Sequence, residues 1–356
     1  MKTRLEMTIC SNNAPLPRLY LLGQQKSGTT TMATALYQAG AVPMVQNRSG
    51  GNIPTYIRRE AGGTYNHSRV LLAGNVKESN LIAGLMKACW SQRCLDSARL
   101  RWEARLTGFG ACERWESTLL ADMSTDSFRW WAHAALLSHM YSITDVKQLI
   151  LVVIMREPLS RFKSGFYWEF NPKFFGLPRG VRHAHNRTLD AELHMLRHAL
   201  PPDFKTARTV AHVLADDWRF DRWYRSMYSL NWHPWLDQFD PAQFVALPMR
   251  WALADLGRAV GLVASRFGVP LWPQAHIRGG SRNDALDVLN RNAHAAAEPD
   301  SGEALLYMQW LVDTFFAPDA VELSHMFARA IPKGLTLGGS GAGDWESVHQ
   351  HLQQSW

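Results

Sequence analysis

The sequence predicts an α/β fold in which a P-loop-like central parallel sheet is flanked by helices. Short apolar runs alternate with segments of helical periodicity, the pattern of strands joined by helical crossovers. An early apolar run turns through a glycine into a helix, and the longest run, residues 149–155, ends at an arginine. With 46% hydrophobic and 19% charged residues in 356, the chain has the composition of a globular protein with a sizeable core.

The early strand, turn and helix occupy the stretch from Arg18 to Gln38, which reads RLYLLGQQKSGTTTMATALYQ. Backbone N–H groups at a helix N-terminus lack partners and lie at the positive end of the helix dipole, so this turn predicts an anion site. Gly28 lets the backbone approach a phosphate, and Lys26 supplies a charge. Hydroxyl donors come from Thr29, Thr30 and Thr31. The alternative is a glycine turn that binds no ligand.

The spacing of this turn differs from that of a Walker A loop, in which lysine directly follows the last glycine of G-x-x-x-x-G-K-[ST]. Here Lys26 comes two residues before Gly28, and Thr29 follows that glycine. The spacing therefore argues against an ordinary ATPase or GTPase and against a P-loop kinase.

A second candidate anion site follows the run LILVVIM at residues 149–155, which is the clearest buried strand. Arg156 comes directly after it, at the strand end where open α/β sheets bind ligands. Pro158 suits the first turn of a helix, and Ser164 falls on that helix. An arginine fork with a hydroxyl suits a phosphate monoester, although an arginine in this position alone is equally typical of a surface ion pair.

The remaining chain predicts one domain over residues 18–332, with a poorly ordered lead-in at 1–17 and a Gly-rich tail at 333–356. Ser or Thr within 123–128 is expected to cap a helix, and the helix after Pro158 is expected to carry Arg161, Lys163 and Ser164 on a polar face. Further strands are predicted at 70–73, 119–122 and 243–247, and further helices over 81–117, 189–200, 251–267 and 304–316.

The formal charge of +7 and the pI of about 9.3 favour anionic partners. Lys and Arg are scattered, so nucleic acid is not predicted as a partner. Cys10, Cys89, Cys94 and Cys112 allow one disulfide or four thiols, and their spacing predicts no zinc site. No apolar run reaches the roughly 20 residues of a membrane helix. With no signal peptide recognised, we expect a cytoplasmic protein or a Golgi-lumenal catalytic domain without its anchor.

Two segments resemble those of sulfotransferases that use 3′-phosphoadenosine 5′-phosphosulfate (PAPS). QQKSGTTT resembles their 5′-phosphosulfate loop, and LILVVIMREPLSRFKSGFYW resembles their 3′-phosphate segment, a strand followed by R-x-P-x-x-R-x-x-S. The order of later pieces is similar to the glycosaminoglycan branch, such as heparan sulfate O-sulfotransferases. Lys77-Glu78 occupies the place of its K-E pair, and residues 122–125 occupy that of its D/E-x-[ST]-P segment. Residues 228–239 occupy the place of its aromatic stretch. The resemblance covers roughly residues 18–330 and implies the sulfotransferase fold.

This resemblance implies transfer of a sulfuryl group from PAPS, without a metal, to a hydroxyl of a carbohydrate. Lys26 is then the catalytic cation and Glu78 the catalytic base, with His133 and His139 as rival bases. The implied donor-binding residues are Lys26, Ser27, Gly28, Thr29, Thr30, Thr31, Arg156, Ser164, Arg278 and Arg282. Met123 stands where the branch often has a lysine, so no second active-site lysine is expected.

The acceptor is expected to approach the variable segment 171–225. Its basic side chains either bind an anionic glycan or form a solvated face; they are Arg179, Arg182, Arg187, Arg197, Lys205 and Arg208. Two alternatives for the function remain. One is a sulfotransferase with a small-molecule acceptor, and the other is a non-catalytic protein that binds a nucleotide or a glycan.

Overall fold

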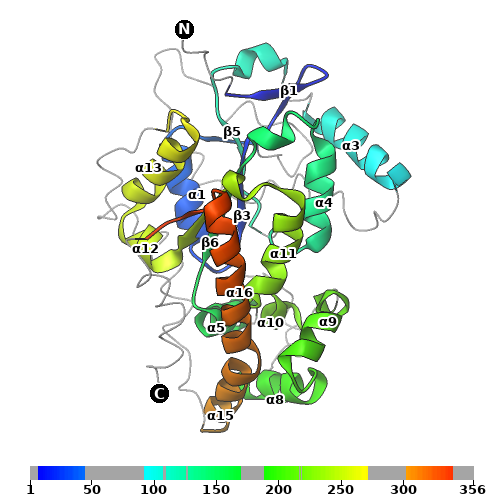
Figure 1. Cartoon of the computed structure of the whole chain (residues 1–356), viewed down its shortest axis with the longest axis vertical. Coiled ribbons are helices and arrows are strands. Elements are labelled where there is room, and N and C mark those ends of the chain that lie inside the picture. Colours follow the sequence, from blue (N-terminus) through cyan, green and yellow to red (C-terminus); the bar gives the residue numbers. More distant parts are fainter. Residues whose placement is uncertain are drawn as a thin grey trace, which may run out of the picture. The chain divides into compact units, whose positions relative to one another are not determined.

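The computed structural model describes residues 7–44, 92–106, 110–125, 127–169, 188–215, 217, 219–271 and 302–339 (Figure 1). The chain divides into two compact units, neither of which is continuous in sequence. The first comprises residues 1–155, 234–277 and 330–339, and the second comprises 156–233, 278–329 and 340–356. The domain boundaries predicted at residues 18 and 332 stay predictions.

The first unit is built on a six-stranded sheet in the order β4-β5-β3-β6-β7-β8, and every neighbouring pair is parallel. Its strands are β3 (Leu19–Gly23), β4 (Val42–Pro43), β5 (Leu120–Asp122), β6 (Ile150–Met155), β7 (Phe244–Pro248) and β8 (Thr336–Leu337). All residues of β6 are buried, as expected for a central strand covered on both faces. The predicted α/β class with a central parallel sheet is therefore confirmed.

Helices of the first unit cover both faces of the sheet. Side chains along each strand alternate in direction, so both faces carry side chains that the helices bury. Leu19 and Leu21 of β3 pack in a core with α1 and α13, whereas Tyr20 between them contacts Tyr141, which follows α4. The helices are α1 (Thr29–Gln38), α3 (Gln92–Leu106), α4 (Trp131–Met140), α12 (Met249–Ala254) and α13 (Leu256–Phe267). Short 3₁₀ turns are η3 (Cys112–Trp115), η4 (Val146–Gln148), η6 (Pro241–Gln243) and η8 (Ile331–Lys333).

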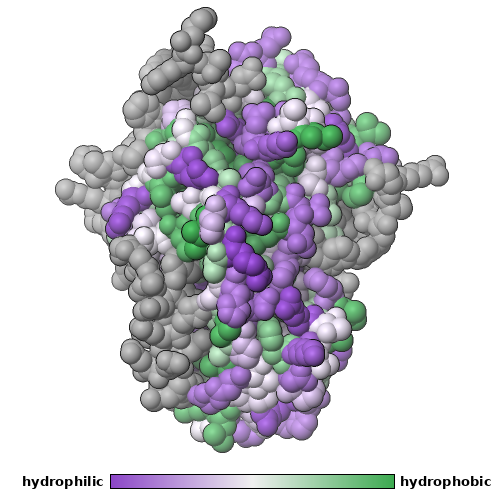
Figure 2. All heavy atoms as spheres, in the orientation of Figure 1, coloured by the Kyte–Doolittle hydropathy of each residue, from purple (hydrophilic) through white to green (hydrophobic). Residues whose placement is uncertain are grey.

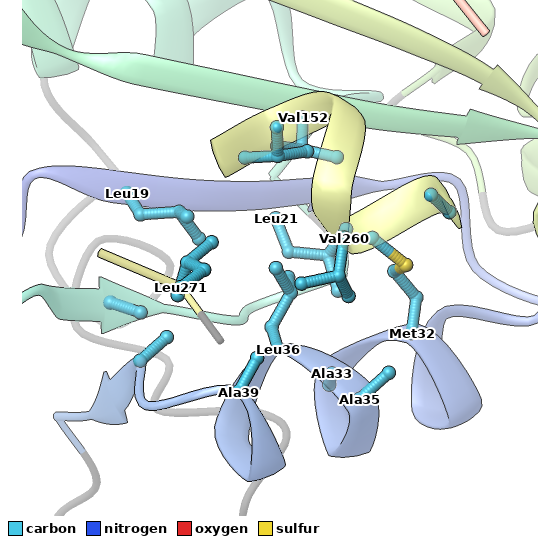
Figure 3. Packing of buried hydrophobic residues seen from close by; sticks show 14 of the residues in the cluster. Leu19, Leu21, Met32, Ala33, Ala35, Leu36, Ala39, Val152, Val260 and Leu271 are labelled. Carbon is cyan, nitrogen blue, oxygen red and sulfur yellow. The ribbon is translucent and has the colours of Figure 1, made fainter. Parts of the chain in front are cut away.

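Figure 3 shows the core on one face of the sheet. Leu21 of β3 and Val152 of β6 lie against Leu36 of α1 and Val260 of α13, and all four are buried. Full burial of such an aliphatic side chain contributes about 1.5–3 kcal/mol to stability. This packing fixes the start of α1 relative to the end of β3, where the predicted anion turn lies.

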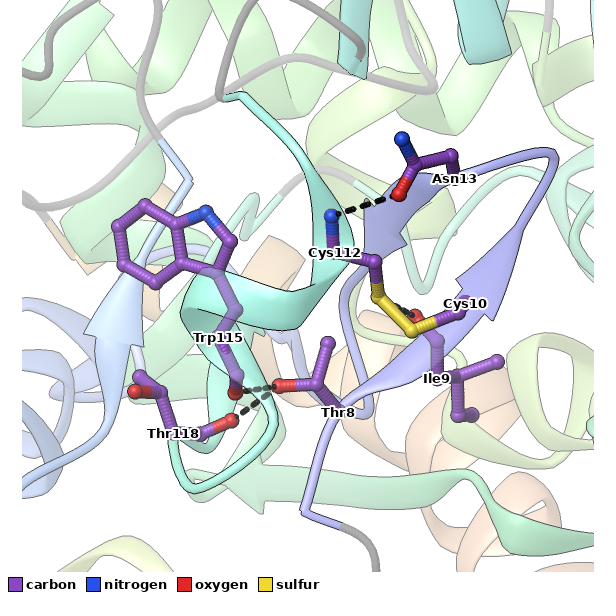
Figure 4. The surroundings of a disulfide bond; sticks show 7 residues. All are labelled: Thr8, Ile9, Cys10, Asn13, Cys112, Trp115 and Thr118. Atoms are coloured by element: carbon purple, nitrogen blue, oxygen red, sulfur yellow. Dashed lines mark hydrogen bonds between the residues drawn. A yellow bond between two sulfur atoms is a disulfide. The ribbon is translucent and has the colours of Figure 1, made fainter.

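Residues 9–16 form a hairpin, within the stretch 1–17 where the sequence suggested a poorly ordered lead-in. Strands β1 (Ile9–Ser11) and β2 (Ala14–Leu16) pair antiparallel. A disulfide joins Cys10 to Cys112, and the Cys112 N–H donates to Asn13 Oδ1 at 3.2 Å (Figure 4). The Thr8 hydroxyl also hydrogen-bonds the Trp115 carbonyl. These partners lie about 100 residues away along the chain, which is why local composition did not reveal them.

The second unit is helical in its described part. It contains α5 (Pro158–Glu169), α8 (Leu189–Ala199), α9 (Phe204–Ala215), α10 (Asp221–Tyr224), most of α11 (Tyr228–Gln238), α15 (Gly302–Leu311), the π-helical turn η7 (Val312–Phe316) and α16 (Ala317–Ala330). Phe162, Trp223 and Phe315 are among the side chains of its core. Hydrophilic side chains gather over α16 in Figure 2, while Leu323 and Phe327 on its other side are buried.

Several predicted elements differ from those in the structure. The helix expected over 251–267 is two helices, because Asp255 leaves helical geometry at φ −147° and its carboxylate accepts the Arg258 N–H. The helix expected to be capped within 123–128 starts only at Trp131, without a side-chain cap. The helix expected over 304–316 continues through η7 into α16. The predicted tail supplies β8, and the strand predicted at 70–73 lies outside the described residues.

Candidate functional site

The turn between β3 and α1 has the local structure that its sequence predicts. β3 ends at Gly23, α1 begins at Thr29, and the cap residue Gly28 has φ 80° with no side-chain hydrogen bond to the helix. The first N–H groups of α1 therefore have no partner within the helix. Lys26 also has positive φ, at 70°, so the turn is tightly curved at two of its residues.

Ser27 shows that the turn contains an unsatisfied donor. Its side chain is 0% exposed, and its hydroxyl has no hydrogen-bond partner within the part of the chain that the structure describes. A buried polar group without a partner costs about 1–3 kcal/mol. An anion held by the neighbouring N–H groups would supply the missing acceptor, so this residue fits a phosphate oxygen.

The turn is enclosed by backbone and side chains that leave no room for a larger residue at its glycines. A Cβ on Gly28 would lie 3.0 Å from Leu253 Cδ1 and 3.1 Å from Met249 Cγ. A Cβ on Gly23, whose φ is 134°, would lie 2.5 Å from the carbonyl oxygen of Thr125. The Gln24 N–H donates to the Ile154 carbonyl at 2.8 Å, which ties the turn to the end of β6.

The strands that carry the two predicted phosphate motifs are neighbours in the sheet. β3 and β6 pair in parallel, with Gly23 opposite Val153, so both end at the same edge. Arg156 directly follows the last residue of β6 and begins the second unit. This topology meets the requirement that both motifs follow the carboxyl ends of adjacent strands.

Within the second unit, α5 starts at Pro158 as predicted, and the Glu157 carboxylate accepts N–H groups of Leu159 and Ser160 at 2.7 and 2.6 Å. Ser164 is buried on this helix. Arg161, expected on a polar face with Ser164, is also buried. It donates to the Arg222 carbonyl at 2.7 Å and is 3.2 Å from Ser226 Oγ. The polar face predicted for α5 is therefore buried at these two residues, and α10 with the chain after it supplies hydrogen-bond partners for Arg161.

Tyr228 is a residue that the spacing of motifs did not single out. Its hydroxyl accepts the Arg156 N–H at 3.1 Å and donates to the Arg156 carbonyl at 2.8 Å. In the sequence it belongs only to a general aromatic stretch, and its contact with Arg156 spans 72 residues. No local signal could have identified it.

The segment after β5 lies beside the strand of the anion turn, because β5 pairs with β3. Both the N–H and the hydroxyl of Ser124 donate to the buried Asp122 carboxylate. Burial, the neighbouring Tyr141 and the Asp122 carboxylate all raise the pKa of Tyr20 well above its usual value. Met123, at the position where the resembling branch often has a lysine, is buried in the hydrophobic core. The described part of this segment therefore offers hydrogen-bonding groups and no cation at that position.

Some predicted site residues stay predictions. Glu78, with Lys77, and Arg278 and Arg282 lie outside the described residues. Of the rival bases, His133 is buried on α4, and His139 Nε2 lies 3.0 Å from Asp96 Oδ1.

Within the described ranges, no group of three or more His, Cys, Asp or Glu side chains is placed to hold a metal ion. None of the helices described there is both long and apolar enough to cross a membrane.

Neither a model of a protein family nor a curated protein matches this chain. Among solved structures, a sulfotransferase from Alicyclobacillus acidocaldarius is similar, at 14% sequence identity and a TM-score of 0.44. The similarity covers 88% of this chain and 96% of that one. At this level the similarity identifies no family.

Proposed function

We propose that the protein is a PAPS-dependent sulfotransferase that sulfates a hydroxyl of a carbohydrate. The observation that carries this proposal is the turn at the start of α1. There the buried Ser27 hydroxyl has no partner among the described residues, and the first N–H groups of the helix have none within the helix. The spacing around Lys26 and Gly28 is not that of a Walker loop and resembles a 5′-phosphosulfate loop. Arg156, after the neighbouring strand, supports a nucleotide with a second phosphate.

The reaction forms a bond between the acceptor oxygen and sulfur and breaks the bond between sulfur and the bridging phosphate oxygen. By analogy with phosphoryl transfer, the transition state is loose and negative charge grows on the leaving oxygen. Lys26 and the N-terminus of α1 would stabilise that charge, and residues 27–31 would hold the 5′-phosphate. Glu78 would accept the acceptor proton. The products are a sulfate ester and adenosine 3′,5′-bisphosphate.

The assignment of a carbohydrate acceptor depends on the basic segment 171–225. Arg197 lies over the Trp310 ring at 4.9 Å, and Arg208 Nη1 is 3.2 Å from Glu322 Oε1. These two guanidinium groups thus already have partners within the protein, which favours a solvated face for them. Recognition of a glycan would then depend on Lys205 and on residues outside the described ranges.

The test is incubation with labelled PAPS and a mixed panel of glycans, phenols and sterols, analysed by mass spectrometry. We expect a sulfated glycan together with adenosine 3′,5′-bisphosphate. A sulfated phenol or sterol would support the small-molecule alternative. Tight bisphosphate binding without transfer to any acceptor would support the non-catalytic alternative.

Lys26→Met provides the matched variant for this assay, because it keeps much of the side-chain length and removes the charge. We expect turnover to fall by about 100-fold or more, the usual loss when one group that stabilises transition-state charge is removed. Unchanged turnover would remove Lys26 from the mechanism.

A further inference from the structure

We propose that Tyr228 is a positioning residue, which sets the backbone of Arg156 so that its guanidinium can meet the 3′-phosphate of the donor. The inference deepens the proposed function and depends on it for the role of Arg156. It concerns the second unit only, in which Tyr228, Arg156 and the residues that hold Tyr228 all lie.

The first observation is that one hydroxyl serves both backbone groups of one residue. Tyr228 Oη accepts the N–H of Arg156 at 3.1 Å and donates its own proton to the Arg156 carbonyl at 2.8 Å. Arg156 lies after β6 ends and before α5 begins at Pro158, so it belongs to neither element. The tyrosine supplies the partners that a strand or helix would otherwise provide.

The second observation is that Tyr228 is itself fixed at its own end. It is the first residue of α11 and is 1% exposed. The buried carboxyl group of Asp319 accepts the Ser229 N–H at 3.0 Å, and the Ser229 hydroxyl donates to it as well. Asp319 therefore holds the start of α11, and with it the ring of Tyr228.

The place of Asp319 follows from the helices around it. It lies in the first turn of α16, directly after the π-helical turn η7. A π turn inserts an extra residue and rotates the following residues about the helix axis, and Pro318 beside it cannot donate to the carbonyl four residues back. Asp319 therefore contacts the start of α11 at Ser229, and the adjacent Tyr228 contacts the backbone of Arg156 through its hydroxyl.

These contacts matter for binding because an arginine grips a phosphate in a directional, bidentate way. A small shift of its backbone would misalign the fork while leaving the charge present. Loss of the Tyr228 hydroxyl should therefore weaken binding of the 3′-phosphate and leave the rest of the nucleotide contacts intact.

The experiment compares Tyr228→Phe with wild type by calorimetric titration of adenosine 3′,5′-bisphosphate and of adenosine 5′-monophosphate. We expect the dissociation constant of the bisphosphate to rise about tenfold, as for loss of about 1.4 kcal/mol, with that of the monophosphate unchanged. Tyr224→Phe is the control, since it removes another buried tyrosine hydroxyl of the same unit and should leave the ratio of the two constants unchanged. Hydrogen exchange of the Arg156 amide should be faster in Tyr228→Phe only.

The outcomes separate the inference from the proposed function. If wild type binds the two nucleotides equally, the 3′-phosphate assignment is lost, and the proposed function and this inference are lost with it. If wild type prefers the bisphosphate and Tyr228→Phe keeps the same ratio, the positioning role alone is overturned. Should Tyr228→Phe fail to fold, Asp319→Ala tests the same contacts, because it removes the acceptor of the Ser229 N–H and hydroxyl. It should also reduce the preference, and an unchanged preference would overturn the inference.

Discussion

In the anion turn between β3 and α1, Gly28 has a backbone conformation and surroundings that tolerate a larger side chain poorly. We predict that Gly28→Ala lowers stability by about 1–2 kcal/mol and weakens nucleotide binding, because its φ of 80° is strained for alanine and its Cβ would press on Leu253. Thermal denaturation and bisphosphate titration measure both effects.

Gly261→Ala is the matched control for that variant. Gly261 lies within α13 and has nothing within 4 Å of where its Cβ would lie. Alanine should stabilise this helix by about 0.5–1 kcal/mol. Equal losses in the two variants would contradict the special conformation assigned to Gly28.

Asp319 should make stability depend on pH. Burial raises the pKa of its carboxyl to about 7 from an ordinary 3.8, against the opposing hydrogen bonds from Ser229. Between those values the unfolded chain loses its proton while the folded chain keeps it, so the contribution of Asp319 to stability falls as pH rises. The loss is about 1.4 kcal/mol per pH unit across that range.

Urea denaturation of wild type and Asp319→Asn from pH 4 to 8 measures this dependence. The difference in unfolding free energy between the two proteins should change by several kcal/mol in favour of Asp319→Asn as pH rises to about 7, and should then level off. A difference that does not vary with pH would contradict the raised pKa.

Elements differ in how well their sequences predict them. β6 and the turn before α1 are predicted correctly because their signals are local: a continuous apolar run in one, and glycine with hydroxyl residues between strand and helix in the other. The hairpin of β1 and β2 is not, because a disulfide and buried contacts with distant residues stabilise it.

The same reasoning applies to the candidate site. Lys26, Ser27 and Gly28 can be singled out from spacing alone, because they are neighbours in one turn. Tyr228 cannot, because its partner Arg156 lies 72 positions away in the sequence. Sequence reasoning thus finds residues that would touch a ligand and misses those that hold such residues in place.

The junction of α12 and α13 allows a prediction at the level of an element. Asp255 caps α13 through the Arg258 N–H at 2.8 Å. Asp255→Ala should therefore cost about 1 kcal/mol in unfolding free energy, measured by chemical denaturation. Asp237→Ala, at an exposed position in the last turn of α11, is the control and should cause no loss. A loss shared by both variants would contradict the capping role.

At the level of the whole molecule, the disulfide between Cys10 and Cys112 closes a long loop with a sequence separation of 102. On the chain-entropy model, a loop of about 100 residues gives about 4–5 kcal/mol of stabilisation. We predict a loss of this order in the double variant Cys10→Ser, Cys112→Ser, measured by denaturant unfolding.

A reducing agent should destabilise wild type and have little further effect on that double variant. Peptide mapping after alkylation without reduction should recover the two cysteines as one cross-linked pair. Recovery of both as alkylated thiols would contradict the disulfide.

The interleaving of the two units has a consequence for synthesis on the ribosome. Strand β8 at residues 336–337 completes the sheet of the first unit, but the chain must first supply residues 156–233 and 278–329 of the second. A nascent chain that stops short of residue 336 lacks β8, one of the two partners of β7, and leaves that side of β7 as an open edge. The first unit is therefore among the last parts of the molecule to be finished, although translation begins with it.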